Sequence, residues 1–102
     1  MKLPEKCENI MEIREAIDTI DKEIIELIGR RFNYVKEIVK FKEKDKDSII
    51  AKDRYNQVIE NRRILAVKNG LNPDLIENIY KSLINHFIDK EIEIVENLKL
   101  RK

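Results

Sequence analysis

Glycine, proline and cysteine are scarce in this sequence, and each shortage excludes a class of protein. Only two glycines and two prolines occur among 102 residues, too few turn residues to close a many-stranded sandwich or barrel. The single cysteine, Cys7, cannot form an internal disulfide. We therefore do not expect a β-rich or disulfide-stabilised protein.

Long apolar runs and an excess of one charge are also missing. No apolar run approaches the roughly 20 residues of a membrane span, and the start MKLPEKCENI lacks the apolar segment of a secretion signal. Twenty-one lysines and arginines balance 20 acids, a net charge of +1, so no general basic field favours nucleic acid or anionic lipid. We expect a cytoplasmic protein with no nucleic-acid or membrane partner, in which a few placed cations bind any anion.

The length predicts one domain, residues 1–102, because typical domains hold roughly 100 to 150 residues. Within it, isoleucine and leucine recur at spacings of three and four from Asn9 to about Lys44, as in a packed helix. These positions are Ile10, Ile13, Ile17, Ile20, Ile24 and Leu27. Asn9 and Glu12 have the form of a capping box at its start, and Gly29 is its only weak point.

Two further helices are expected after a polar loop over residues 44–48, where Asp47 or Ser48 caps the second helix. The second helix ends at Asn69-Gly70, a common C-terminal stop. The third begins with Asn72 as its N-cap and Pro73 at its first position. The predicted fold class is therefore all-α, with three helices in the order long, short, long.

The first helix is too long for its own domain. At 1.5 Å per residue it spans about 50 Å, whereas a compact chain of this length has a diameter of roughly 35 Å. Its apolar stripe needs a partner along its whole length, so we predict an obligate homodimer with a second copy interleaved with the first. The alternative is a kink at Gly29 that folds the helix back on itself.

Three cations lie on or beside this apolar stripe. Arg31 occupies a position where an aliphatic residue is due, Lys42 would point the same way eleven residues later, and Arg14 flanks the stripe. A buried cation needs a partner. Acids of the same helix, such as Asp18, Asp21 or Glu23, are one possibility. For Arg31 a ligand carboxylate is the other, because the guanidinium fork binds one bidentately.

Glu91 breaks the apolar stripe of the third helix between Phe87 and Ile94. An ion pair with one of the arginines would lower its pKa. Burial would instead raise its pKa, so that a protonated carboxyl group donates a hydrogen bond to an ether or hydroxyl oxygen. The sequence shows no metal site, no glycine-rich phosphate loop and no activated nucleophile, so we expect no metal and no cofactor. The pair Arg62-Arg63 is interpreted as a solvated helix face.

Placed cations and one unusual carboxyl group suit a pericyclic reaction, which needs its substrate held in a reactive conformer and its developing charge stabilised. The sequence resembles the all-helical class of chorismate mutases and, within it, the small isochorismate pyruvate lyases of salicylate and siderophore synthesis. The resemblance covers nearly the whole chain. It rests on residues 13–18, Ile20-Asp21, Arg30-Arg31, residues 34–36, Phe41-Lys42, Arg54 and residues 69–71.

The resemblance implies an intertwined dimer and a small dicarboxylate substrate. Arg31, together with Arg14 from the other subunit, would bind the two substrate carboxylates. Lys42 would contact the ether oxygen and a carboxylate. The other implied site residues are Arg54 for carboxylate binding, Ile88 in the ring pocket, Glu91 facing the ether oxygen, and residues 42–48 as a lid.

Two departures from the family pattern bear on the activity. Glu91 stands where many members carry glutamine, so we expect activity to favour acidic pH. Tyr55 stands where true mutases generally have a glutamate, which favours the lyase branch. We therefore expect an isochorismate pyruvate lyase with chorismate mutase side activity. The alternatives are a housekeeping chorismate mutase that forms prephenate, or a non-enzymatic helical adaptor that binds a partner helix.

Overall fold

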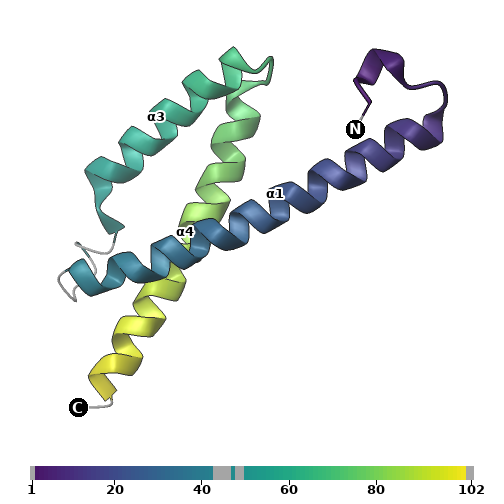
Figure 1. Cartoon of the computed structure of the whole chain (residues 1–102). Coiled ribbons are helices and arrows are strands. Elements are labelled where there is room, and N and C mark those ends of the chain that lie inside the picture. Colours follow the sequence, from purple (N-terminus) through teal and green to yellow (C-terminus); the bar gives the residue numbers. More distant parts are fainter. Residues whose placement is uncertain (1, 43–46, 48–49, 101–102) are drawn as a thin grey trace. The chain divides into compact units, whose positions relative to one another are not determined.

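The computed structural model describes residues 2–42, 47 and 50–100, and the regular structure of this part of the chain is entirely helical. The elements are η1 (Pro4–Lys6), α1 (Ile10–Ile38), η2 (Val39–Phe41), α3 (Lys52–Lys68) and α4 (Pro73–Leu100) (Figure 1). Within the described residues, the long, short, long order of α1, α3 and α4 confirms the predicted fold class. The chain forms two compact units, residues 1–34 and 35–102, whose boundary falls within α1.

α1 is one continuous helix of 29 residues, about 43 Å long at 1.5 Å per residue. The helix runs through Gly29 without interruption, so the alternative prediction of a kink at Gly29 is wrong. α1 ends at Ile38, however, and not near Lys44. The chain tightens there into η2, where the buried Val39 packs with Val95 of α4. Lys42 follows with extended backbone, so the expected placement of Arg31 and Lys42 on one continuous helix is also wrong.

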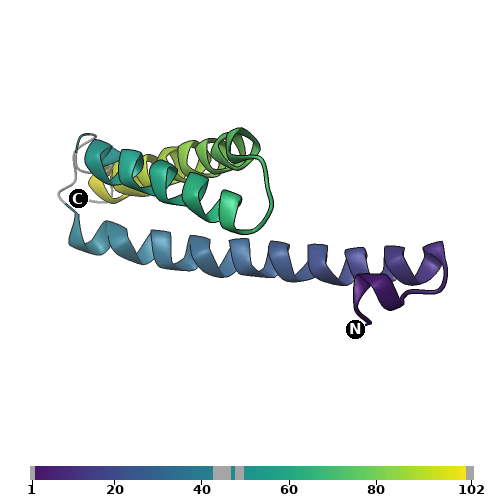
Figure 2. The same cartoon turned by 90° about the horizontal axis from the view of Figure 1, so that it is seen from above.

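α3 and α4 form a helical hairpin, in which the two helices lie side by side and antiparallel (Figures 1 and 2). Gly70 adopts a φ of 72° just after α3, which allows the Leu71 N–H to donate to the Ala66 carbonyl oxygen at 2.8 Å. The Asn72 side-chain oxygen then accepts from the N–H groups of Asp74 and Leu75, at 2.7 and 3.2 Å. Both predicted signals, the stop at Gly70 and the cap at Asn72, are confirmed.

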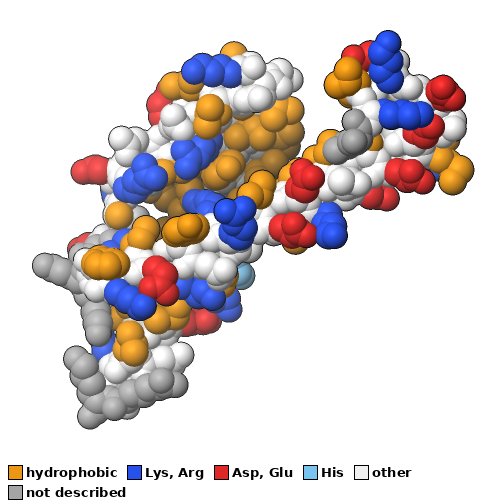
Figure 3. Space-filling view, viewed as in Figure 1, with side chains coloured by type: hydrophobic (Ala, Val, Ile, Leu, Met, Phe, Trp, Pro, Cys, Tyr) orange, Lys and Arg blue, Asp and Glu red, His pale blue; other side chains and the backbone are white. Residues whose placement is uncertain are grey.

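Hydrophobic side chains gather between α3 and α4 (Figure 3). The buried residues of these two helices are Val58, Ile59, Ala66, Phe87, Glu91 and Val95. Arg63 joins the helices at their rim, because its guanidinium lies 2.8 Å from the Asp74 carboxylate and 3.1 Å from that of Glu77. The Arg62 guanidinium lies 5.5 Å from the centre of the Tyr80 ring. These two arginines, interpreted from the sequence as a solvated helix face, are partly exposed and also contact acidic and aromatic side chains of α4.

The apolar stripe of α1 remains accessible in the single chain. Its six side chains are between 43% and 60% exposed; they are Ile10, Ile13, Ile17, Ile20, Ile24 and Leu27. Within the described residues, no helix is long and apolar enough to cross a membrane.

Candidate active site

Glu91 is the one buried charged residue in the part of the chain that the structure describes, with 4% of its surface exposed. It lies on α4 one helical turn after Phe87 and one turn before Val95, both of which are buried. The α4 stripe that packs the core therefore also carries a carboxyl group into it.

Lys42 is the partner of Glu91. Its ammonium nitrogen lies 3.4 Å from Oε1 of Glu91, to which it donates a hydrogen bond. The Lys42 side chain is 23% exposed and that of Glu91 only 5%. η2 holds Lys42 here, because Val39, three residues earlier, packs with Val95, one turn beyond Glu91. Residues from either end of the 35–102 unit thus form one ion pair beside an apolar cluster.

The two influences expected on Glu91 both operate, and burial is the larger. Loss of solvation raises the pKa of Glu91 above its ordinary range, while the nearby Lys42 ammonium opposes the increase. The ion-pair partner within the 35–102 unit is Lys42, whereas the alternative considered from the sequence was an arginine. The direction of the pKa shift favours the interpretation in which Glu91 takes up a proton and becomes a hydrogen-bond donor.

Ile88 belongs to the same neighbourhood. It is half-buried and packs against the Val39 and Val95 cluster, as do Ile92 and Ile94. Since residues three apart share a helix face, Ile88 and Glu91 present an apolar and a polar group on the same side of α4. Lys42, Ile88 and Glu91 are therefore brought together within the 35–102 unit.

The structure gives the local surroundings of the three arginines predicted for the site. Arg54 is exposed in the first turn of α3 and donates to Oε1 of Gln57 at 3.1 Å. Arg14 is exposed and Arg31 is half-buried, both on the part of α1 that belongs to the 1–34 unit. Of the predicted lid, residues 43–46 and 48 lie outside the described residues, as does the Ser48 cap. The alternative cap, Asp47, is wrong, because α3 begins at Lys52 and its N-cap is Ala51.

Sequence reasoning missed Val39, which positions Lys42 through its packing. Its burial fixes η2 and hence the position of Lys42. The available signal was its spacing, because Val39 follows Val35 by one helical turn and precedes Lys42 by three residues. Residues 2–42, 47 and 50–100 contain no group of three histidine, cysteine, aspartate or glutamate side chains that could hold a metal ion.

The fold and this neighbourhood define a class of protein: an all-helical chain that carries a buried carboxyl group and a placed ammonium beside apolar side chains. The comparisons with known proteins identify the family to which this helical fold belongs. The family model for chorismate mutase type II matches residues 13–92. The isochorismate pyruvate lyase of Pseudomonas aeruginosa is 37% identical over 93 residues, which cover 91% of each chain. The T-proteins of Haemophilus influenzae and Enterobacter agglomerans are 32% and 28% identical over 72% and 78% of this chain, but over only 20% and 21% of their own lengths.

This chain belongs to the chorismate mutase type II family and is an enzyme of that family. Membership favours an enzyme over the helical adaptor considered from the sequence.

Proposed function

We propose that this enzyme is an isochorismate pyruvate lyase, which converts isochorismate to salicylate and pyruvate and has chorismate mutase activity as a side reaction. The observation that carries the proposal is the similarity to the Pseudomonas aeruginosa lyase, which extends over nine-tenths of both chains. Tyr55, directly after Arg54, supports the lyase branch because true mutases generally carry a glutamate at that point.

The reaction needs binding and charge stabilisation more than covalent chemistry. Isochorismate has the same atoms as salicylate and pyruvate together, so the ether bond breaks while a hydrogen passes from the ring to the departing enolpyruvyl group. The leaving oxygen becomes more negative as the bond breaks. A protonated Glu91 and the Lys42 ammonium would stabilise that oxygen, and their contact at 3.4 Å makes it possible for both to reach one substrate atom.

Three arginines complete the proposed site. Arg31 and Arg14 bind the two substrate carboxylates, Arg54 assists in carboxylate binding, and Ile88 lines the ring pocket. Arg14 is contributed by the second subunit of an intertwined homodimer. The accessible apolar stripe of α1, with side chains 43% to 60% exposed, supports that dimer, because a second copy would remove those side chains from water.

Chorismate mutase is the second candidate function. The matching family model supports it, and the two T-protein relatives, matched over only about a fifth of their length, add weak support. In that case the same cations would bind chorismate, and the rearrangement would yield prephenate. The proposed lyase and the alternative mutase use the same site. They differ in whether the site accelerates the conversion of isochorismate or that of chorismate more.

A direct comparison of substrates separates the two functions. The purified enzyme is given isochorismate or chorismate, and kcat/KM is measured for the formation of salicylate and of prephenate. A higher value for salicylate supports the lyase, and a higher value for prephenate supports the mutase. Arg31→Ala should abolish the faster activity. Arg30→Ala, which removes the exposed neighbouring guanidinium, is the matched control and should retain it. Turnover preserved in Arg31→Ala would contradict the site assignment.

A further inference from the structure

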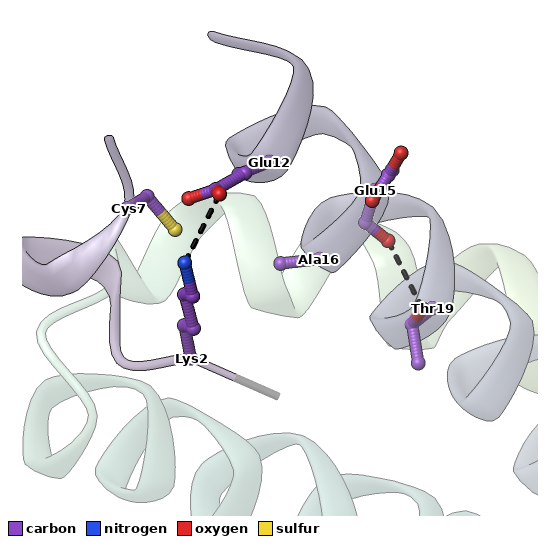
Figure 4. A pocket seen from close by; sticks show the side chains of 6 residues that line it. All are labelled: Lys2, Cys7, Glu12, Glu15, Ala16 and Thr19. Atoms are coloured by element: carbon purple, nitrogen blue, oxygen red, sulfur yellow. Dashed lines mark hydrogen bonds and ion pairs between the residues drawn. The ribbon is translucent and has the colours of Figure 1, made fainter. Parts of the chain in front are cut away.

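The segment before α1 folds against the first turns of that helix. η1, residues Pro4–Lys6, turns the chain so that Lys2 returns to the helix and its ammonium nitrogen lies 3.0 Å from Oε1 of Glu12 (Figure 4). The returning segment also borders a pocket over α1. The other residues that line it are Cys7, Glu15, Ala16 and Thr19.

Glu12 is the centre of this arrangement. Its second carboxylate oxygen accepts a hydrogen bond from the Glu8 backbone N–H at 2.9 Å, and its own N–H donates to the side-chain oxygen of Asn9 at 2.9 Å. The backbone hydrogen bond from Glu8, followed by the bond from Lys2, holds the pKa of Glu12 below its ordinary range. Lys2, Glu8, Asn9 and Glu12 together form what we call the N-terminal clasp.

The apolar side chains at the start of α1 are accessible within the part of the chain that the structure describes. Ile10, Met11 and Ile13 are 60%, 67% and 43% exposed. The first four N–H groups of a helix have no partner within the helix, so an uncapped end frays. The clasp supplies an acceptor for one of these groups and ties the preceding segment to the second turn. The order of the first two turns of α1 therefore depends on it.

Arg14 follows Glu12 by two residues on these same turns. We propose that Glu12, held by Lys2, is a positioning residue for Arg14: the clasp fixes the turn of α1 that carries the Arg14 guanidinium and so sets its approach to a substrate carboxylate. This inference rests on the proposed function, in which Arg14 binds that carboxylate in the site of the other subunit. An arginine fork binds a carboxylate bidentately only in a narrow range of orientations. Loss of the clasp therefore weakens substrate binding while the chemistry at Lys42 and Glu91 stays intact.

The inference is tested with single substitutions in the full-length enzyme. Glu12→Gln and Lys2→Met should each raise KM for isochorismate about three- to tenfold and change kcat less than about twofold. Glu5→Gln and Lys6→Met remove the same charges from exposed positions in η1, and KM should stay unchanged in both controls. Glu12→Asp, which keeps a carboxylate acceptor, should recover part of the lost affinity. An unchanged KM in Glu12→Gln would overturn the inference.

A second measurement distinguishes positioning from a general structural role. In an Arg14→Ala background, Glu12→Gln should cause no additional increase in KM, because the group that it positions is absent. An equal increase in both backgrounds would overturn the inference. So would a decrease in the thermal midpoint of Glu12→Gln large enough to unfold the enzyme at the assay temperature, because global unfolding would then account for the whole increase in KM. If Arg14→Ala itself leaves KM unchanged, the proposed carboxylate role of Arg14 fails and the inference fails with it. If Arg14→Ala raises KM but Glu12→Gln does not, only the inference fails.

Discussion

Replacing Glu91 with glutamine tests the protonation on which the proposed chemistry depends. Glu91 is 4% exposed, and burial raises its pKa against the opposing effect of the Lys42 ammonium 3.4 Å away. A carboxyl group donates a hydrogen bond to an ether oxygen only when it is protonated, whereas a glutamine amide donates at every pH. We therefore expect wild-type activity to fall as the pH rises through the pKa of Glu91, and Glu91→Gln to lack that decrease.

The size of the effect follows from the titration. Above the pKa of Glu91, the protonated fraction falls tenfold for each pH unit, so wild-type kcat/KM should fall by about the same factor. Over two pH units the ratio of Glu91→Gln to wild type should therefore rise about a hundredfold.

Initial rates of salicylate formation at constant ionic strength between about pH 5 and pH 9 measure this ratio. Glu93→Gln is the matched control, because Glu93 lies on the same helix but its side chain is 62% exposed and pairs with Lys90. This control should keep the wild-type pH profile. Parallel profiles for wild type and Glu91→Gln, or no increase of the variant over wild type at neutral pH, would refute the reasoning.

Four further outcomes are expected. Lys42→Met leaves the Glu91 carboxylate without its cation and should lower the free energy of unfolding by about 1–3 kcal/mol at pH 7, less than for a fully buried pair because Lys42 keeps 23% of its side-chain surface. Urea denaturation should show a smaller loss at acidic pH, where Glu91 takes up a proton and no longer needs a cation as its partner. Asn72→Ala removes the cap of α4 and should cost about 1 kcal/mol in the same assay, with most of it restored by Asn72→Ser. Arg63→Ala should lower the thermal midpoint at low salt and less at high salt, since it removes ion pairs with α4; an equal decrease at both salt concentrations would contradict a role through charge. Ile20→Lys, on the accessible stripe of α1, should convert a dimer to a monomer by light scattering, and a monomeric wild type would exclude the dimer.

The sequence predicts helix ends well where the signal is local. Asn9, Gly70 and Asn72 each act on backbone groups within a few residues, so their spacing is enough to place a cap or a stop. The end of α1 has no such signal. It depends on Val39 packing with Val95, a contact between residues far apart in the chain, and the apolar periodicity continues past the point where the helix stops.

The sequence predicts which residues are candidates for the site, but it predicts only some of the contacts between their side chains. A carboxyl group in an apolar stripe marks Glu91, and its burial confirms that the position is unusual. The sequence did not identify Lys42 as the ion-pair partner of Glu91. The first helix was predicted to continue past Lys42, which placed Lys42 on the same helix face as Arg31. The ion pairs of Arg63 were missed for a similar reason, since the acids that neutralise it belong to the next helix.

The beginning of α3 has a consequence for amide hydrogen exchange. Ala51 precedes this helix with a φ of 46°, in the left-handed region that an alanine side chain disfavours, and it has no side-chain acceptor to offer the first turn. The first amides of α3 should therefore exchange with solvent faster than those of α4, which Asn72 caps. Arg54 belongs to that first turn. An anion that binds Arg54 would also order the backbone beneath it, so slowed exchange over residues 52–54 would report ligand binding even without turnover.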